Sequence, residues 1–364
     1  MSDLRTLKRR IGQRIIVGFD GPKVPPEVLR LDEEWGLGGF ILFKRNLPTF
    51  EQVLELTEHL WTMGQGVPPF IGVDQEGGLV HRLPKPFSTF PDMAHLGQVG
   101  SVSLAYEVGA VLGRELTAAG FNLNFAPILD INTNPQNPVI GRRAISSSPQ
   151  QVSSLGRAVI RGLHDNAIVA CGKHFPGHGD TRQDSHHEMA YSEADMERLR
   201  AVELVPFHAA FHRPPNLDLV MTAHVKYTAI DPKHPATLSR TMLQDLLRLD
   251  LGYKGLVVSD DLEMKAITEH YSMEEVALLG LEAGIDLFLV CHSVDQQVAL
   301  LEALLREAET GSYPKHLWER SYQRVRDVKA RHFRVVRSID RGHAREVVGN
   351  REHQRISRRL KDGK

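Results

Sequence analysis

AIVACGKHFPGHGDTRQDSHHE, Ala167 to Glu188, joins an apolar run to a polar loop. Its first five residues, Ala167 to Cys171, are rich in Ala, Ile and Val and predict a fully buried strand. The segment from Lys173 to Glu188 contains two Asp and four His but almost no apolar side chain, so it cannot form core. A polar loop after a buried strand is a typical place for the chemistry of an α/β enzyme. The alternative is a solvated loop without function.

Further apolar segments recur along the chain and leave room for a helix between them. Together with Ala167 to Cys171 they predict eight strands. The other seven are Arg14 to Asp20, Gly38 to Phe43, Phe70 to Asp74, Phe121 to Asp130, Leu217 to His224, Gly255 to Asp261 and Asp286 to Val290. Helical patterns lie between them, at Glu51 to Met63, Ser103 to Ala118, Pro149 to His164, Ala194 to His212 and Arg240 to Leu249. Ser272 and Glu275 form a capping-box pattern that opens another helix.

Alternating apolar strands and amphipathic helices predict an α/β fold, and eight such units predict a closed (β/α)₈ TIM barrel in a single domain. An open doubly wound sheet is the structural alternative, but no Gly-rich phosphate loop follows the first strand. Val294 to Glu307 is predicted as the last barrel helix, and His316 to Arg337 as an extra C-terminal helix. We therefore expect a domain over residues 1–340. The basic tail, residues 341–364, is too charged to form a core of its own, and we expect it to be partly disordered.

Composition excludes several classes of protein. The chain has 364 residues, of which 41% are hydrophobic and 24% charged, and no apolar stretch approaches the roughly 20 residues that span a bilayer. A net charge of −1 gives no general attraction to nucleic acid. Gly12, Gln13 and Arg14 interrupt the apolar run near the N-terminus, so we expect no export signal there. Cys171 and Cys291 are expected to be buried thiols, and we therefore expect a cytoplasmic protein without a membrane or nucleic-acid partner.

In a (β/α)₈ barrel, polar residues at the C-terminal ends of the strands converge on one face. The predicted strands end in acidic, lysine and histidine side chains, which indicates a charged pocket. These residues are Asp20, Asp74, Glu76, Asp130, Lys173, His174, His224, Asp260 and Asp261.

Five segments together resemble glycoside hydrolase family 3, in the same order, over about residues 10 to 340. They are VDQEGGLVHRL from Val73, VIGRRA from Val139, KHFPGHGDTRQDSHH from Lys173, MTAHVKY from Met221 with PATLS from Pro235, and VVSDDLEM from Val257. The resemblance is strongest to the single-domain bacterial β-N-acetylglucosaminidases of peptidoglycan recycling. One departure is Arg142, which stands where the family usually has an acidic residue before the arginine.

The resemblance implies a retaining mechanism in which Asp260 is the nucleophile. Because neighbouring strand residues face opposite sides, only one of Asp260 and Asp261 is expected to face the pocket, and this argument alone does not choose between them. A structural ion pair suits Asp261 better. The resemblance also implies an acid/base dyad of Asp184 and His186, and a histidine titrates in a range that suits both proton transfers.

The other motif positions are implied to bind substrate, through Asp74, Arg82, Arg143, Lys173 and His174. For the two arginines the alternative is a purely structural salt bridge. We also expect His178 to shape the loop, His187 to be exposed, and Gly177 and Gly179 to act as hinges that let the dyad close over substrate.

The implied function is hydrolysis of terminal, non-reducing β-linked N-acetylglucosamine from small, muropeptide-like carbohydrates, without a metal or other cofactor. Three alternatives stay open: a family 3 β-glucosidase, an inactive sugar-binding barrel, and a metal-dependent hydrolase. The side chains that could bind a metal are His174, His178, His186, Asp184 and Asp260.

Overall fold

Eight parallel strands close into a barrel in the computed structural model, which describes residues 4–185, 187–214, 216–311, 313–333 and 338–363. The strands are hydrogen-bonded in the order β1-β10-β9-β7-β5-β4-β3-β2. Their bounds are β1 (Ile15–Val17), β2 (Gly39–Leu42), β3 (Phe70–Val73), β4 (Leu123–Asn124), β5 (Val169–Phe175), β7 (Leu219–Thr222), β9 (Leu256–Asp261) and β10 (Leu287–Val290). Seven predicted strand segments contain one of them, and the eighth, Ala167 to Cys171, overlaps β5, which continues to Phe175. The (β/α)₈ barrel is thus confirmed.

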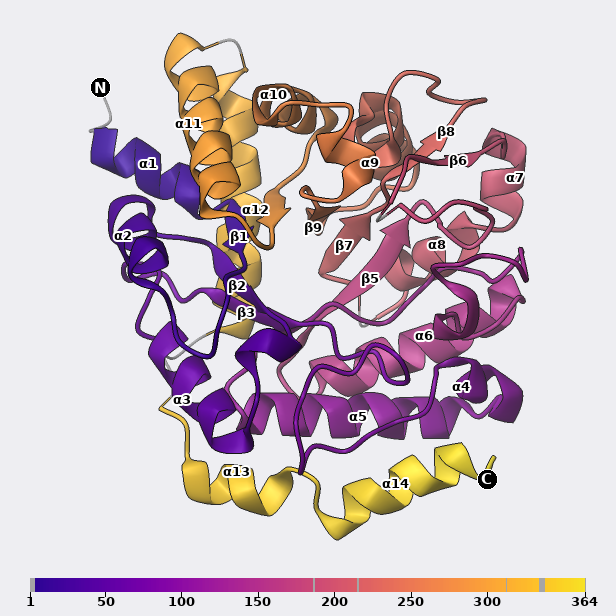
Figure 1. Cartoon of the computed structure of the whole chain (residues 1–364). Helices are drawn as coiled ribbons and strands as arrows, with labels where there is room; N and C mark the ends of the chain where they lie inside the picture. The colour runs from indigo at the N-terminus through magenta and orange to yellow at the C-terminus, as the bar shows by residue number, and fades with distance from the viewer. Residues whose placement is uncertain (1–3, 186, 215, 312, 334–337, 364) are drawn as a thin grey trace.

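The strands read as continuous apolar runs because both of their faces are covered. Every residue of β1 and β10 is buried, and the two strands pair in parallel with Ile16 opposite Leu289. Helices surround the barrel (Figure 1) and bury their apolar sides against it. Such two-sided burial removes the alternation of polar and apolar residues that a half-exposed strand would show.

A helix follows each barrel strand. The surrounding helices are α2 (Pro26–Trp35), α3 (Phe50–Leu60), α5 (Val102–Ala118), α6 (Pro149–His164), α8 (Leu204–His212), η4 (Thr241–Asp250), α10 (Met273–Ala283) and α11 (Val294–Thr310). The remaining elements are α1 (Leu4–Gly12), η1 (Lys44–Asn46), α4 (Ala94–Val99), η2 (Gly141–Arg143), β6 (Ala190–Ser192), α7 (Met196–Ala201), β8 (Val225–Tyr227), η3 (Ala236–Leu238), α9 (Lys265–Thr268), α12 (Lys315–His332), α13 (Arg341–Val347) and α14 (Arg351–Lys361). β6 and β8 form a separate two-stranded sheet.

Most of the predicted helices match these elements. The capping box is present, because Ser272 Oγ accepts from the Glu275 backbone and the Glu275 carboxylate accepts from the Ser272 backbone. The helix predicted over Ala194 to His212 is divided into α7 and α8. Pro206 explains the division: it has no N–H to donate and is tolerated only in the first turn of the new helix α8.

The tail after residue 340 differs from the disorder that we expected. It forms α13 and α14, which pack along α5 (Figure 1). Ile356 and Leu360 are buried against the body of the protein, and the buried carboxylate of Glu115 accepts from His353 Nδ1 at 2.8 Å and from the Gly349 backbone at 2.9 Å. The sequence prediction considered the total charge and overlooked this apolar stripe at helical spacing.

Helix α12 closes the end of the barrel where the strands begin. Lys329 on this helix is only 3% exposed, and its Nζ donates to Gln13 Oε1 at 2.7 Å and to the Gly38 carbonyl at 2.8 Å. Burial lowers the pKa of Lys329 to about 7, because burial disfavours the charged ammonium group. The extra C-terminal helix is therefore a structural part of the barrel.

Both cysteines are buried, and neither forms a disulfide. This agrees with the expectation of two buried thiols. Among the described helices, none is long and apolar enough to cross a bilayer.

Asp286, at the start of β10, connects four parts of the same end of the barrel. Its fully buried carboxylate accepts from Arg324 Nη2 at 2.6 Å and Arg248 Nη2 at 2.7 Å, and also from Ser321 Oγ and the Val257 backbone. Burial acts to raise the pKa of Asp286, but the two arginines outweigh it and hold that pKa below its usual value. The ionised carboxylate therefore joins η4 and α12 to the barrel.

We predict that Asp286→Ala lowers the free energy of unfolding by about 3 kcal/mol, because it leaves the partly buried guanidinium groups of Arg248 and Arg324 without their carboxylate. Urea unfolding followed by circular dichroism measures the change. Asp250→Ala is the matched control, since it removes a surface ion pair with Arg200 and should cost no more than about 1 kcal/mol. Equal losses in the two variants would contradict the structural role of Asp286.

Candidate active site

A pocket of about 400 Å³ lies at the C-terminal ends of the barrel strands. Six of the predicted site residues line it together, although they come from distant parts of the chain. They are Asp74, Arg82, Arg143, Lys173, His174 and Asp260. Other pocket-lining residues are Ile41, Phe43, Glu76, Val80, Val139, His178, Ser185, Met221, Asp261, Met264, Leu289, Cys291 and His292.

A buried carboxylate, Glu76, organises one wall of the pocket. Lys173 Nζ lies 2.7 Å from Glu76 Oε1 and 2.6 Å from Asp74 Oδ1. Arg143 binds the same carboxylate of Glu76 through two hydrogen bonds, Nε to Oε2 at 3.0 Å and Nη2 to Oε1 at 2.9 Å. Burial opposes ionisation of all three groups, but their mutual attraction outweighs it. The pKa of Glu76 is therefore well below its usual value, and those of Lys173 and Arg143 are above theirs.

Sequence reasoning placed Glu76 at a strand end but did not include it among the substrate-binding residues. Glu76 stands two positions after Asp74 and follows the same buried strand, and this placement could have indicated that Glu76 also faces the pocket. The structural alternative for Arg143, a salt bridge, is present, and the side chain nevertheless lines the pocket. Arg142 points elsewhere: its side chain is 71% exposed and pairs with Asp92 at 2.7 Å. An arginine at position 142, where the family usually has an acidic residue, therefore does not change the pairing of Arg143 with Glu76.

His174 is oriented by Asp130, which follows β4. Asp130 Oδ2 lies 2.7 Å from His174 Nδ1, and Oδ1 accepts from the backbone N–H of His174 at 3.0 Å and of His178 at 2.7 Å. Burial acts to raise the pKa of Asp130, but His174 outweighs it and lowers that pKa. Because Nδ1 is hydrogen-bonded to Asp130, only Nε2 of His174 is left to hydrogen-bond a ligand.

His178 fixes the loop that follows β5. Its ring is buried, with Nδ1 2.8 Å from Thr181 Oγ1 and Nε2 2.9 Å from Ser185 Oγ. The expected loop-shaping role of His178 is thus present. Gly179 packs so closely that a Cβ there would lie 1.7 Å from the Ile131 carbonyl oxygen, which explains the glycine without any hinge. Ser185 brings this part of the loop to the wall of the pocket.

The predicted acid/base dyad is only partly within the described residues. His186 lies outside them. Asp184 is described and its side chain is 30% exposed, while the following Ser185 lines the pocket. His187 is 76% exposed, as expected. The roles of Asp184 and His186, and the closure of the loop over substrate, stay predictions.

Both Asp260 and Asp261 line the pocket, so the expectation that only one of them would face it is wrong. The pairing of β9 with β10 is irregular: Leu287 lies opposite Val258, whereas Leu289 lies opposite Asp261. Three steps along β9 therefore match two along β10, which breaks the regular alternation of faces.

The two aspartates nevertheless have different surroundings. Burial acts to raise the pKa of Asp260, but His174 and His224 outweigh it and hold that pKa below its usual value. Asp261 accepts backbone N–H groups of Glu263 at 3.1 Å and Cys291 at 3.3 Å, and burial raises its pKa to about 7. Both carboxylates accept backbone N–H groups, since Asp260 Oδ1 accepts from Asp261 at 2.8 Å, but only Asp260 has a lowered pKa and so stays ionised.

The other strand-end residues have structural contacts. Asp20 is exposed and pairs with Arg45 at 2.7 Å, outside the pocket. His224 is buried, with Nδ1 2.7 Å from Thr237 Oγ1 and Nε2 2.9 Å from the Asp261 carbonyl oxygen. Arg82 lines the pocket, and its buried Nε has no hydrogen-bond partner within the described part of the chain. A buried donor of this kind is available to a ligand.

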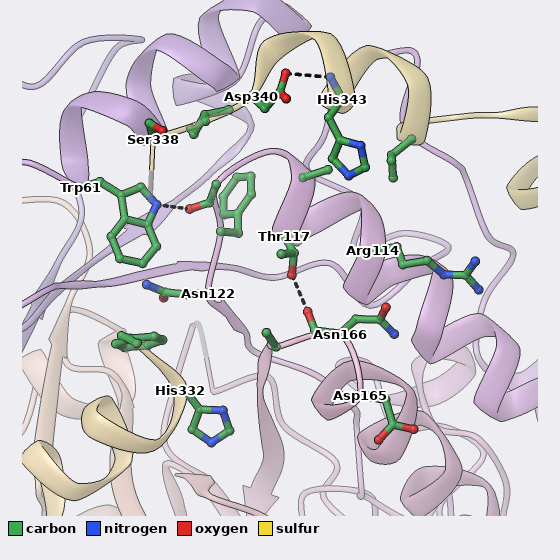
Figure 2. Close-up of a pocket in the computed structure, with 17 residues that line it drawn as sticks. Trp61, Arg114, Thr117, Asn122, Asp165, Asn166, His332, Ser338, Asp340 and His343 are labelled. Atoms are coloured by element: carbon green, nitrogen blue, oxygen red, sulfur yellow. Dashed lines mark hydrogen bonds between the residues drawn. The ribbon is translucent and has the colours of Figure 1, made fainter. Parts of the chain in front are cut away.

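A larger cavity, of about 530 Å³, lies at the opposite end of the barrel. Figure 2 shows the side chains that line it. Trp61, Asn122, Asn166 and His332 are among its walls, and none of the predicted site residues lines it. It lies near the residues that precede β4 and β5, where a barrel enzyme does not place its chemistry. Across the described ranges, no group of three or more His, Cys, Asp or Glu side chains is arranged to hold a metal ion.

We predict that His178 makes stability depend on pH. Burial lowers the pKa of His178 to about 4, so the unfolded chain binds a proton first and the free energy of unfolding falls as the pH drops from about 6.5 towards 4. His178→Gln should reduce the loss between pH 7 and pH 5 by about 2 kcal/mol, as measured by urea unfolding. The same substitution at the exposed His187 is the matched control. An unchanged pH dependence in His178→Gln would contradict the prediction.

Known proteins resemble this chain over most of its length. A β-hexosaminidase A from Pseudoalteromonas piscicida is 31% identical over 363 residues, covering 93% of this chain and 60% of that protein. The chain therefore spans less than two thirds of that relative. The structure of a glycoside hydrolase family 3 β-N-acetylglucosaminidase from Paenibacillus sp. str. FPU-7 superposes with a TM-score of 0.93 at 40% identity, covering 98% of this chain and 68% of the other.

A third similarity extends over nearly the whole of both chains. NagZ from Neisseria gonorrhoeae, solved in complex with N-trifluoroacetyl-D-glucosamine, superposes with a TM-score of 0.77 at 30% identity, covering 96% of this chain and 97% of that chain. Residues 6–328 match the glycosyl hydrolase family 3 N-terminal domain. The chain belongs to glycoside hydrolase family 3.

Proposed function

We propose that this protein is a β-N-acetylhexosaminidase that hydrolyses terminal, non-reducing β-linked N-acetylglucosamine with retention of configuration. Family membership and the relatives described above support activity on carbohydrate. The observation that carries the proposal is that the ionised Asp260 shares one pocket with Lys173, Asp74 and Arg143. A carboxylate beside several groups that bind hydroxyls suits the cleavage of a glycosidic bond.

In the proposed first step, the Asp260 carboxylate attacks the anomeric carbon and the bond from that carbon to the leaving oxygen breaks. The lowered pKa of Asp260 keeps the nucleophile deprotonated. The imidazolium of His186 gives its proton to the leaving oxygen. In the second step, water attacks the anomeric carbon, returns a proton to His186 and releases Asp260.

Asp184 would orient the His186 imidazole and stabilise its protonated form. Support for this dyad comes from the chain between them, because Ser185 lines the same pocket as Asp260. The buried hydrogen bonds of His178 hold that part of the loop at the pocket wall. The acid/base group is thus expected near the leaving oxygen.

Asp74, Arg82, Arg143, Lys173 and His174 are proposed to bind the sugar. Their charged hydrogen bonds would be left unpaired by a sugar that lacks a matching hydroxyl, and this selects the substrate. The structure of NagZ with N-trifluoroacetyl-D-glucosamine supports an N-acylated glucosamine as the sugar. Muropeptide-like fragments are the proposed natural source of that sugar. No cofactor has a part in this mechanism.

We predict that Asp260→Ala lowers kcat at least about 10³-fold, because the covalent step loses its nucleophile. Nitrophenyl N-acetyl-β-glucosaminide is the substrate, and the nitrophenyl glucoside should be cleaved much more slowly by the wild type. Added azide should restore turnover of the variant and give the α-glycosyl azide, since it enters from the face that Asp260 leaves open.

Asp261→Ala is the matched control for the neighbouring carboxylate, and it should form no glycosyl azide. Azide rescue of Asp261→Ala but not of Asp260→Ala would move the nucleophile to Asp261. An Asp260→Ala variant that keeps the wild-type rate would end the proposed mechanism.

We predict that His186→Ala slows the hydrolysis of substrates with poor leaving groups far more than that of substrates with good ones. The phenolate of a phenol with a low pKa can leave with little protonation. Plotting log kcat/KM for a series of aryl glycosides against the pKa of the phenol should therefore give a steeper line than for the wild type. His187→Ala is the matched control and should keep the wild-type slope. An equal loss for all leaving groups in His186→Ala would contradict the role in proton transfer.

A further inference from the structure

The order of the strands around the barrel indicates on which side of the pocket the leaving group of a bound sugar lies. The groups proposed to bind the sugar hydroxyls come from β3, β5 and the loop after β4, so they surround the end of β4. In the closed order, β10 is four strands away from β4 and lies directly across the barrel. A pyranose carries C1 on the opposite side of its ring from C4. With C4 near β4 and C1 beside Asp260 on β9, the group attached to C1 therefore leaves over β10.

An aromatic pair stands at that side of the pocket. Phe43 directly follows β2, and His292 comes two residues after β10. Their ring centroids are 5.7 Å apart with an interplanar angle of 23°, and both residues line the pocket. The side chain of His292 is 53% exposed, so a ligand can reach it. We call this pair the Phe43–His292 rim.

The rim is held rigidly from below. The Glu263 carboxylate accepts the backbone N–H of His292 at 2.5 Å and of Ser293 at 2.8 Å. Arg45 donates to the Cys291 carbonyl at 2.7 Å, and its Cζ lies 4.4 Å from the centre of the Phe43 ring. These contacts fix the pair in place. Arg45 covers part of the Phe43 ring, so most of the surface that the rim offers to a ligand belongs to the half-exposed His292 ring. A fixed surface binds a ligand with little loss of conformational freedom.

We propose that the Phe43–His292 rim is the subsite for the leaving group and that it binds a second pyranose. The apolar face of a sugar ring packs on flat aromatic rings, and the imidazole can hydrogen-bond a hydroxyl of the same sugar. His292 Nε2 also lies 3.5 Å from Asp261 Oδ2, at the wall of the same pocket. This inference rests on the proposed function, because the proposed sugar-binding residues set the direction of the substrate.

The test compares two substrates with alkyl leaving groups, N,N′-diacetylchitobiose and methyl N-acetyl-β-glucosaminide. Only the first has a pyranose on the leaving side. In His292→Ala and in Phe43→Leu, which keeps apolar volume but loses the flat ring, the ratio of kcat/KM for the disaccharide to that for the methyl glycoside should fall about tenfold. His316→Ala, on the exposed surface of α12, is the matched control and should keep the wild-type ratio.

Thermal unfolding of each variant checks that it is folded. A ratio within twofold of the wild type in both rim variants would overturn the inference. An equal loss on both substrates would mean that the rim binds the cleaved sugar itself, which also overturns it. A wild-type enzyme that cleaves neither substrate would instead refute the proposed function, and the assignment of the rim would fall with it.

Discussion

The buried carboxylate of Glu76 sets the geometry of the pocket because it neutralises two cations at once. Lys173 arrives on β5 and Arg143 on the loop after β4, and each disfavours the charged form of the other. A shared carboxylate overcomes this repulsion and fixes both side chains with charge-assisted hydrogen bonds. The pocket is therefore arranged before any substrate enters, which is the condition under which oriented charges are most effective.

The same principle recurs around the pocket. Asp130 orients His174 and holds the backbone of the histidine-rich loop, while Glu263 holds the backbone under the aromatic rim. None of these carboxylates needs to touch a sugar. Each one positions a side chain that faces the cavity, so acids behind the pocket wall, of which Glu76 and Asp130 are buried and Glu263 is partly buried, place the groups that face a ligand.

The barrel was predictable because strands covered on both faces leave uninterrupted apolar runs in the sequence. Most site residues were predictable because they follow those runs or match family motifs. Three features were not. The irregular pairing of β9 with β10, the docking of Leu360 and the stacking of Phe43 on His292 depend on partners far away in the chain. The catalytic dyad, the natural substrate and the cytoplasmic location stay predictions.

The reactivity of Lys329 can report how often α12 separates from the end of the barrel where the strands begin. Its Nζ is shielded between α12, Gln13 and the Gly38 carbonyl, so an amine-reactive reagent can reach it only when the helix lifts away. Exposed lysines react without such a step. The labelling rate at this one position, followed by mass spectrometry, therefore reports the free energy of the opening that exposes Lys329 Nζ.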